Sequence, residues 1–406
     1  MILHICDFST EVLLHIFQYC DVYDLCRLRR SCKRFNRIIL QHRNINENKI
    51  LVTNQKKYPI RYRSLILLDP FEKWRISHNW KTGRYKTITL LKQDKKFMPW
   101  LVLDNTFLWL SQGIHIKAYK RTSNRGVAVR VPHYILSDGN QNDIVKFSCK
   151  DNYIISGQRN GGVWLWSKKE ERLIINIPQC HESDITCVDV LNDIFITGSH
   201  DKLFKIWPLQ LDTKDLEPLY VKNLSDRIWS LGICPTRKSL AIGSAGCNNI
   251  PPFHIFDLER CQPVISRGHT FIKGSGILDL HWENDKTILT CGYDGYLRKW
   301  DIRTGECEQK WEDPHDSALY CLASDDLYTV VTGANLFGRV VLWDQRLRNY
   351  IQMYYTCNNS NLNRSSPVYS ISFDGCQLFT ALDSYVKCLD FSSLKCREIK
   401  NYSNIF

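Results

Sequence analysis

Hydrophobic positions near the start of the chain recur at three- and four-residue steps, which predicts helices. Between Val12 and Cys20, seven of nine residues are apolar, and they form two adjacent stripes. Ser9 is a suitable N-cap, and Glu11 in the first turn suits the positive end of the helix dipole. Asp21 can cap a second helix. The apolar face of this second helix would consist of Leu25, Leu28, Cys32, Phe35 and Ile38–Ile39, and its other face is basic. The pattern predicts a helical hairpin over 7–35.

This hairpin has more apolar surface than it can cover. Two short helices cannot bury both of their apolar faces against each other, so another surface must supply the rest. Periodicity alone leaves two alternatives open. Either a partner protein covers the hairpin, or the hairpin packs on the larger domain of its own chain.

Farther along, the hydrophobic pattern changes to the two-residue alternation of strands. Alternating strands that end on a large apolar residue recur every 41 to 49 residues, a period typical of propeller repeats. The seven expected strands are 114–119, 163–166, 203–207, 253–257, 297–301, 340–344 and 386–390. A ring of blades must join its first and last blades. Either the alternating stretch 85–91 or the segment 396–399 could supply the closing strand.

Three of these units, which end at Trp207, Trp300 and Trp343, resemble WD repeats. The resemblance implies a hydrogen-bond relay in each unit, because a buried indole N–H must find an acceptor. In the first unit the relay residues would be His181, Thr197, Asp201 and Trp207. The second unit has His269 and Asp294, with Cys291 at the hydroxyl position, and the third has His315, with Phe337 in place of the aspartate. Ser199, His200 and Asp201 are also the residue types of a catalytic triad. Adjacent residues generally cannot adopt triad geometry, so we interpret these three as a blade turn and expect no enzyme activity.

The N-terminal pattern resembles the F-box over nearly its whole length, in Glu11-Val12-Leu13, in Ile16-Phe17 and in Cys32-Lys33-Arg34-Phe35. It departs from that family at Phe8-Ser9, where Leu-Pro is usual, and at Cys20, where Leu is usual. The resemblance implies docking onto the Skp adaptor of Skp/cullin/F-box ubiquitin ligases. The implied adaptor contacts are Phe8, Val12, Leu13, Ile16, Phe17, Leu25, Leu28 and Cys32. Further strings, at 74–80, 312–322 and 366–369, are similar to one F-box/WD-repeat subfamily.

The net charge of +12 raises the question of nucleic-acid binding. Residues 1–96 hold 20 Lys and Arg against 8 Asp and Glu, so the rest of the chain is neutral. A phosphate-binding surface on the larger domain is therefore not expected. In the polar, basic stretch 44–84, which shows few regular signals, we interpret Trp74 and Trp80 as anchors of a linker on the propeller rather than as a base-stacking patch.

The 17 cysteines are scattered without a CxxC pair, and several occupy apolar positions of expected strands (Cys187, Cys291, Cys321 and Cys388). Free buried thiols in a reducing compartment fit this better than disulfides or zinc ligands. No secretory signal or membrane span is evident, so we expect the cytosol or the nucleus. No residue pattern calls for a metal or a cofactor.

The sequence thus predicts an all-β, seven-bladed WD-repeat propeller preceded by a small α-helical F-box domain. Residues 1–43 would form the F-box, 44–96 a basic linker with a possible closing strand, 97–400 the propeller and 401–406 a tail. The expected function is that of the substrate-recognition subunit of a ubiquitin ligase, which binds the Skp adaptor, through it cullin, and target proteins. The alternative is a non-ligase WD-repeat scaffold. Candidate target-binding residues at one rim are Arg159, Asp184, His200, Arg227 and Tyr293, and a reader of phosphorylated motifs is not favoured.

Overall fold

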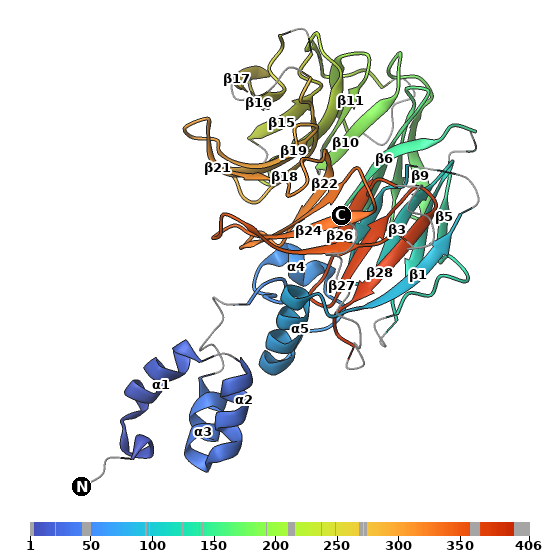
Figure 1. Ribbon diagram of the computed structural model, residues 1–406. Coiled ribbons are helices and arrows are strands. Elements are labelled where there is room, and N and C mark those ends of the chain that lie inside the picture. Colours follow the sequence, from blue (N-terminus) through green and yellow to red (C-terminus); the bar gives the residue numbers. More distant parts are fainter. Residues whose placement is uncertain are drawn as a thin grey trace.

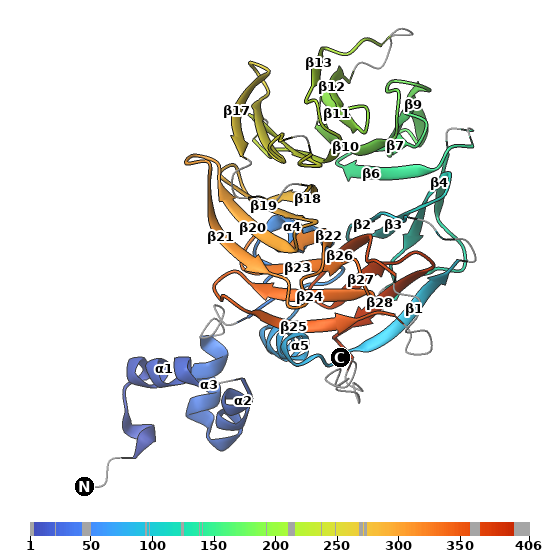
Figure 2. The same ribbon diagram turned by 45° about the horizontal axis from the view of Figure 1, so that its top comes forward.

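The computed structural model describes residues 4–393, except 21, 43–49, 94–95, 97, 123–125, 138, 140, 192, 210–215, 237, 248, 268–270, 272–273 and 358–365. A small helical domain stands beside a ring of β-sheets, and two further helices lie between them (Figures 1 and 2). The expected fold class, a seven-bladed propeller preceded by a helical region, is confirmed.

The described part of the helical domain contains three α-helices where the sequence predicts two. A short 3-10 helix, η1 (Ile5–Asp7), precedes α1 (Thr10–Tyr19), α2 (Val22–Ser31) and α3 (Lys33–Gln41). The predicted second helix is interrupted at Cys32, whose backbone is extended and whose Sγ accepts a hydrogen bond from the Phe35 N–H at 3.4 Å. Cys32 therefore caps α3 instead of continuing α2. Ser9 caps α1 as predicted, and Asp21 lies outside the described residues.

The stretch 44–84 also differs from the sequence prediction, which assigns it no regular element. It contains α4 (Tyr58–Arg63) and α5 (Pro70–Thr82). The signals for α5 are present in the sequence: Asp69 accepts hydrogen bonds from the first-turn N–H groups, Pro70 opens the helix, and Gly83 ends it in the left-handed region at φ 68°.

Helix α5 connects the cores of the two domains. Trp74, near its start, is buried in the helical domain with Phe17 and Ile39. Trp80, near its end, is buried against the last blade, where its ring stacks on that of Phe391 with a centroid distance of 3.7 Å. The interpretation that both tryptophans anchor a linker to the propeller is therefore correct for Trp80 and wrong for Trp74.

Within the described residues the propeller comprises seven four-stranded antiparallel sheets. The third strand of each blade is the alternating strand that the sequence predicts, because its apolar side chains pack between blades. The blades are, in order: β2 (Leu101–Leu103), β3 (Phe107–Gln112), β4 (His115–Lys120), β5 (Tyr134–Leu136); β6 (Ile144–Lys150), β7 (Tyr153–Gln158), β8 (Val163–Ser167), β9 (Arg172–Ile177); β10 (Ile185–Leu191), β11 (Ile194–Ser199), β12 (Leu203–Pro208), β13 (Tyr220–Asn223); β14 (Ile228–Ile233), β15 (Ser239–Ser244), β16 (Phe253–Asp257), β17 (Gln262–Arg267); β18 (Ile277–Trp282), β19 (Thr287–Gly292), β20 (Tyr296–Asp301), β21 (Glu306–Glu312); β22 (Leu319–Ser324), β23 (Thr329–Ala334), β24 (Arg339–Asp344), β25 (Tyr350–Tyr355); and β26 (Ser370–Phe373), β27 (Gln377–Ala381), β28 (Tyr385–Asp390), β1 (Lys86–Lys92).

The ring is closed by β1, which pairs antiparallel with β28 from Lys86 opposite Asp390 to Lys92 opposite Tyr385. Of the two segments that could supply the closing strand, the structure thus uses the one at 85–91. The other, 396–399, lies outside the described residues. The outer strand of the last blade comes from before the first blade, so the two ends of the ring are held together.

The helices α4 and α5 cover one face of the ring. Arg63, at the end of α4, donates to the carbonyl of Ser324, where β22 ends, at 2.6 Å. The Val52 N–H donates to Thr329 Oγ1, where β23 begins, at 2.9 Å. The start of β22 therefore lies on the opposite face. We call this opposite end of the central channel the mouth.

Candidate adaptor-binding and target-binding sites

The helical domain keeps three of its eight predicted adaptor contacts in its own core. Leu13, Phe17 and Leu25 are fully buried among residues of α3 and Trp74. Their apolar character is explained by packing within the domain, so they are not surface contacts in this structure. Sequence periodicity could not separate them from surface residues, because the third helix that covers them was missed.

The remaining predicted contacts reach the surface. Val12 is 45% exposed. The other four, Phe8, Ile16, Leu28 and Cys32, are half-buried at the edge of the core. Tyr19 is 77% exposed and lies on the same side of α1 as Val12 and Ile16, one turn farther along, with its ring 5.4 Å from that of His15. Val12, Ile16 and Tyr19, which we call the α1 face, form an apolar stripe. Within the described part of the chain Val12 and Tyr19 are exposed, and Ile16 is half-buried between them.

The third blade contains a complete relay of the expected residues. Trp207 Nε1–H donates to Thr197 Oγ1 at 3.1 Å, Thr197 Oγ1 contacts His181 Nε2 at 2.8 Å, and His181 Nδ1 contacts Asp201 Oδ2 at 2.8 Å. Burial lowers the pKa of His181, although Asp201 opposes the effect, so the ring is neutral at neutral pH. Asp201 can only accept, so Nδ1 carries the proton, and Nε2 accepts from the Thr197 hydroxyl. The relay ties β11 and β12 to the segment that precedes β10 and to the turn that holds Asp201.

In the fifth blade the relay differs from the sequence prediction. Trp300 donates to Thr290 Oγ1 at 2.9 Å, so the hydroxyl position is Thr290 and not Cys291. The strand alternation points the Cys291 side chain to the other face of the blade, where it is a buried thiol packed in the next interface. Asp294 pairs with Arg298 at 2.5 Å, and His269 lies outside the described residues.

The sixth blade also departs from the prediction. Trp343 donates to Thr332 Oγ1 at 2.9 Å. His315 is exposed, so it is not the buried member of a relay. A buried ion pair between Asp313 and Arg339 lies close by, and this pair was missed because Arg does not belong to the repeat pattern. Phe337 has a left-handed backbone, φ 59°, in the turn before β24.

All five candidate target-binding residues lie at the mouth. Arg159, His200 and Tyr293 directly follow the second strands of their blades, whereas Asp184 and Arg227 directly precede the innermost strands. Innermost strands β6, β10, β14, β18 and β22 each carry a β-bulge one residue from their start. The bulged residues are Val145, Thr186, Trp229, Leu278 and Tyr320. A bulge re-aims its side chain, and here it turns Trp229 and Tyr320 toward the mouth.

Aromatic side chains line the mouth along blades three to seven. Consecutive ring centroids are 4.6 Å apart for His200 and Trp229, 6.2 Å for Trp229 and Tyr293, 6.0 Å for Tyr293 and Tyr320, and 6.1 Å for Tyr320 and Tyr369. We call these five residues the aromatic arc. Two of them, His200 and Tyr293, are among the predicted target-binding residues. Trp229 and Tyr320 were not predicted because they occupy bulges, and Tyr369 directly precedes β26.

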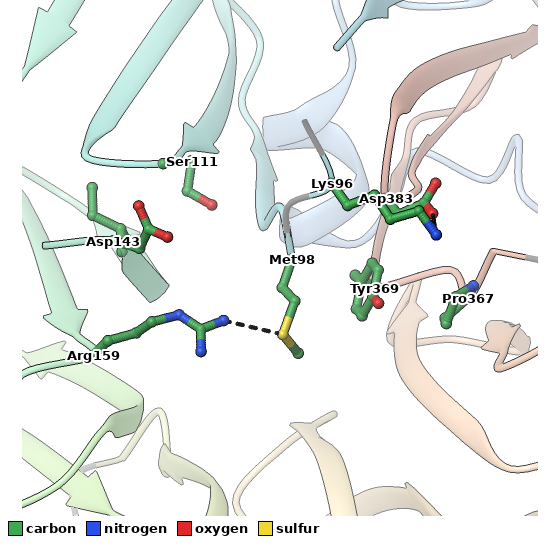
Figure 3. A pocket seen from close by; sticks show the side chains of 10 residues that line it. Lys96, Met98, Ser111, Asp143, Arg159, Pro367, Tyr369 and Asp383 are labelled. Atoms are coloured by element: carbon green, nitrogen blue, oxygen red, sulfur yellow. Dashed lines mark hydrogen bonds and ion pairs between the residues drawn. The ribbon is translucent and has the colours of Figure 1, made fainter. Parts of the chain in front are cut away.

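The other side of the mouth is charged and balanced. Arg159 lies 3.8 Å from Asp184 and donates to Met98 Sδ at 3.4 Å, while Lys96 lies 3.4 Å from Asp383. Figure 3 shows Arg159 extending toward Met98, with Tyr369 and Asp383 beyond it. These side chains line a cavity of about 220 Å³. Positive and negative groups alternate here, so this side has no strong net charge.

Deeper in the channel, an ion pair links opposite blades. Lys146 on β6 lies 3.1 Å from Asp279 on β18, and its ammonium group is 3.9 Å from the centre of the Trp100 ring. This pair forms the floor of the mouth. The mouth thus combines aromatic rings on one side with paired charges on the other and in the channel.

The fold and these two surfaces define an F-box/WD-repeat protein, an architecture typical of non-catalytic adaptors. An F-box-like family model matches residues 10–45, and the WD domain, G-beta repeat model matches residues 173–208 and 261–301.

More specifically, the chain belongs to the family of F-box/WD repeat-containing protein 4. It is 32% identical over 388 residues to the mouse protein of that name, which covers 94% of this chain and 92% of the relative, and the human protein matches equally well. It is also 21% identical, over 67% of its length, to the nuclear distribution protein PAC1 of Candida glabrata. The crystal structure of the computationally designed protein Ika8 covers 74% of this chain and 99% of its own, with a TM-score of 0.55 and 18% identity. That similarity shows the propeller fold alone. None of the described helices is long and apolar enough to cross a membrane.

Proposed function

We propose that this protein is the substrate-recognition subunit of a Skp/cullin/F-box ubiquitin ligase. Its α1 face would dock the Skp adaptor, and through it cullin, while the mouth of the propeller holds a target protein. The observation that carries the proposal is the exposed α1 face on a domain that matches the F-box model. Exposed contiguous apolar surface of this kind marks a protein interface.

The proposed mechanism is approximation. The helical domain and the propeller share α5, whose two tryptophans belong to different cores, so the target would be held in a defined position relative to the adaptor. A target lysine would then meet the charged ubiquitin-conjugating enzyme at high effective concentration. We place this activity in the cytosol or nucleus, which suits the free thiols of the described cysteines.

The test is to place charge on the α1 face without disturbing the core. The double variant Val12→Asp, Tyr19→Asp, at residues that are 45% and 77% exposed, should weaken capture of the Skp adaptor by at least about a hundredfold, because each buried carboxylate at an apolar interface is costly. Phe17 is unsuitable for this purpose, because it is fully buried and its replacement would unfold the domain.

The matched control is Val264→Asp, a change of the same type at a 61% exposed valine on β17 of the propeller. It should leave adaptor capture unchanged. Undiminished adaptor binding by the folded double variant would refute the proposal and favour the alternative, a WD-repeat scaffold that uses the α1 face for another partner.

A further inference from the structure

One carboxylate at the mouth has no cation of its own. Asp143 directly precedes β6, is exposed, and lines the cavity of about 220 Å³ between the first, second and last blades. The two cations that also line this cavity are already paired, Arg159 with Asp184 at 3.8 Å and Lys96 with Asp383 at 3.4 Å. No residue that the structure describes forms an ion pair with Asp143. Two cations thus face three carboxylates, and the charge left over is negative.

The side chain of Asp143 is free to meet a bound group. Figure 3 shows its carboxylate on the opposite side of the cavity from Tyr369, with the Met98 side chain between them. The Arg159 side chain extends toward Met98, to whose Sδ it donates at 3.4 Å. The main-chain carbonyl of Asp143 accepts the Arg159 N–H at 3.0 Å, so the backbone fixes the position of Asp143 and its carboxylate takes no part in this bond.

The other walls of the cavity suit a long basic side chain. Ile144, Pro367, the Tyr369 ring and Met98, which is 47% exposed, supply apolar surface. An arginine has an apolar stem and a charged, planar head, so it can pack its stem on such walls while the head reaches a carboxylate. The volume is smaller than that of pockets for drug-sized molecules and matches one side chain.

The cavity continues into the aromatic arc, because Tyr369 belongs to both. Its ring centroid lies 6.1 Å from that of Tyr320, which lies 6.0 Å from that of Tyr293. Tyr293 is 43% exposed, and its ring meets that of Tyr320 at an interplanar angle of 80°. Rings in such edge-to-face order leave ring faces on which a large apolar side chain can pack.

We propose that the mouth binds a basic–apolar segment of a target protein. An arginine of the segment enters the cavity, its guanidinium pairs with the Asp143 carboxylate, and its stem packs on Tyr369 and Met98. A large apolar residue beside this arginine packs on Tyr293 and Tyr320. The inference rests on the proposed function and names the target class that the same site would select.

The charges of the cavity disfavour a phosphorylated segment. A phosphate group carries a charge near −2 and needs cations that are free to bind it. Here Arg159 and Lys96 would have to exchange their own carboxylates for the phosphate, and Asp143 would repel it. An incoming guanidinium meets the reverse situation, because it finds one carboxylate without a counter-charge.

The experiment uses the full-length protein and a library of nonapeptides that are random except for one fixed central residue. Fixed arginine should bind at least about fivefold more than fixed citrulline, which has the same length and no charge, as expected for a charge-assisted hydrogen bond. Large apolar residues should be enriched beside the fixed arginine. Tyr369→Leu, which removes the ring shared by the cavity and the arc, should weaken the binding of fixed-arginine peptides severalfold.

The decisive variant is Asp143→Asn, which keeps the shape of the side chain and removes its charge. It should reduce the preference for arginine over citrulline to less than about twofold. The matched control is Asp151→Asn, the same change at an exposed aspartate that directly follows β6, at the opposite end of the same strand. This control should keep the full preference.

Equal binding of fixed arginine and citrulline, stronger selection of phosphoserine or glutamate, or an arginine preference that survives Asp143→Asn would each overturn the inference. Adaptor capture is measured on the same preparations. Normal capture with no arginine preference refutes only the target class, whereas loss of capture by the α1-face variant and not by the cavity variants supports the proposed function independently.

Discussion

The relay of the third blade yields the sharpest stability prediction. Thr197→Val replaces a fully buried hydroxyl with a methyl group of similar volume, so it leaves no cavity. It removes the acceptor of the Trp207 N–H and the donor to His181 Nε2. Each buried polar group left without its partner costs about 1–3 kcal/mol, so the variant should lose about 3 kcal/mol of unfolding free energy. For a domain of this size the melting temperature should fall by about 5 °C.

The assay is thermal and urea unfolding followed by tryptophan fluorescence. The control is Thr87→Val, the same change at a half-exposed position on β1, which should alter stability by less than about 0.5 kcal/mol. In a Trp207→Phe background the indole N–H is absent, so Thr197→Val should cost less than in the wild type. A Thr197→Val protein as stable as the wild type, or an equal cost in both backgrounds, would refute the relay as a source of stability.

Two further predictions concern the face covered by α4 and the pH dependence of stability. Arg63→Met removes the donor to the Ser324 carbonyl and the cation close to Asp325 and Asp326, so it should cost about 3 kcal/mol and speed proteolysis around α4. Arg61→Met changes an exposed residue on the same helix and should alter neither the stability nor the rate of proteolysis. Equal rates of proteolysis for the Arg63→Met and Arg61→Met variants would contradict the prediction. Burial lowers the pKa of His254 to about 4, so the unfolded state takes up a proton first as the pH falls below 6.5. The stability from neutral His254, complete above pH 6.5, should fall by about 3 kcal/mol toward pH 4. His254→Gln should flatten the dependence of unfolding free energy on pH between 6.5 and 4, measured by urea titration at each pH. An unchanged pH dependence in this variant would contradict the prediction.

Repetition made the propeller predictable. Seven alternating strands at regular spacing each occupy the third position of a blade, because a strand buried between blades needs large apolar residues at every second position. The Trp207 relay was also predictable, because its four residues follow the repeat pattern. At Trp300 the pattern misled by one residue: strand alternation puts Thr290, and not Cys291, on the face of the indole.

The helical domain shows where local periodicity is insufficient. The apolar spacing in α1 correctly indicated a helix with apolar faces. It could not show that Leu13 and Phe17 lie in the core while Val12 and Tyr19 lie on the surface, because α3 and Trp74 decide which side is covered. Cys32 interrupts what reads as one helix because its side chain caps α3. Neither feature is visible in the spacing of apolar residues.

By itself, the sequence determined the two kinds of element, the number of blades and the neutral charge of the propeller, because these follow from local periodicity and composition. Tertiary structure decided which strand closes the ring, which apolar residues of α1 face solvent, and that His200, Trp229, Tyr293, Tyr320 and Tyr369 meet at one mouth. These outcomes depend on contacts between residues far apart in the chain and on bulges that shift the register of innermost strands. Pairing of this kind is set by the closing of the whole ring, and no local pattern encodes it.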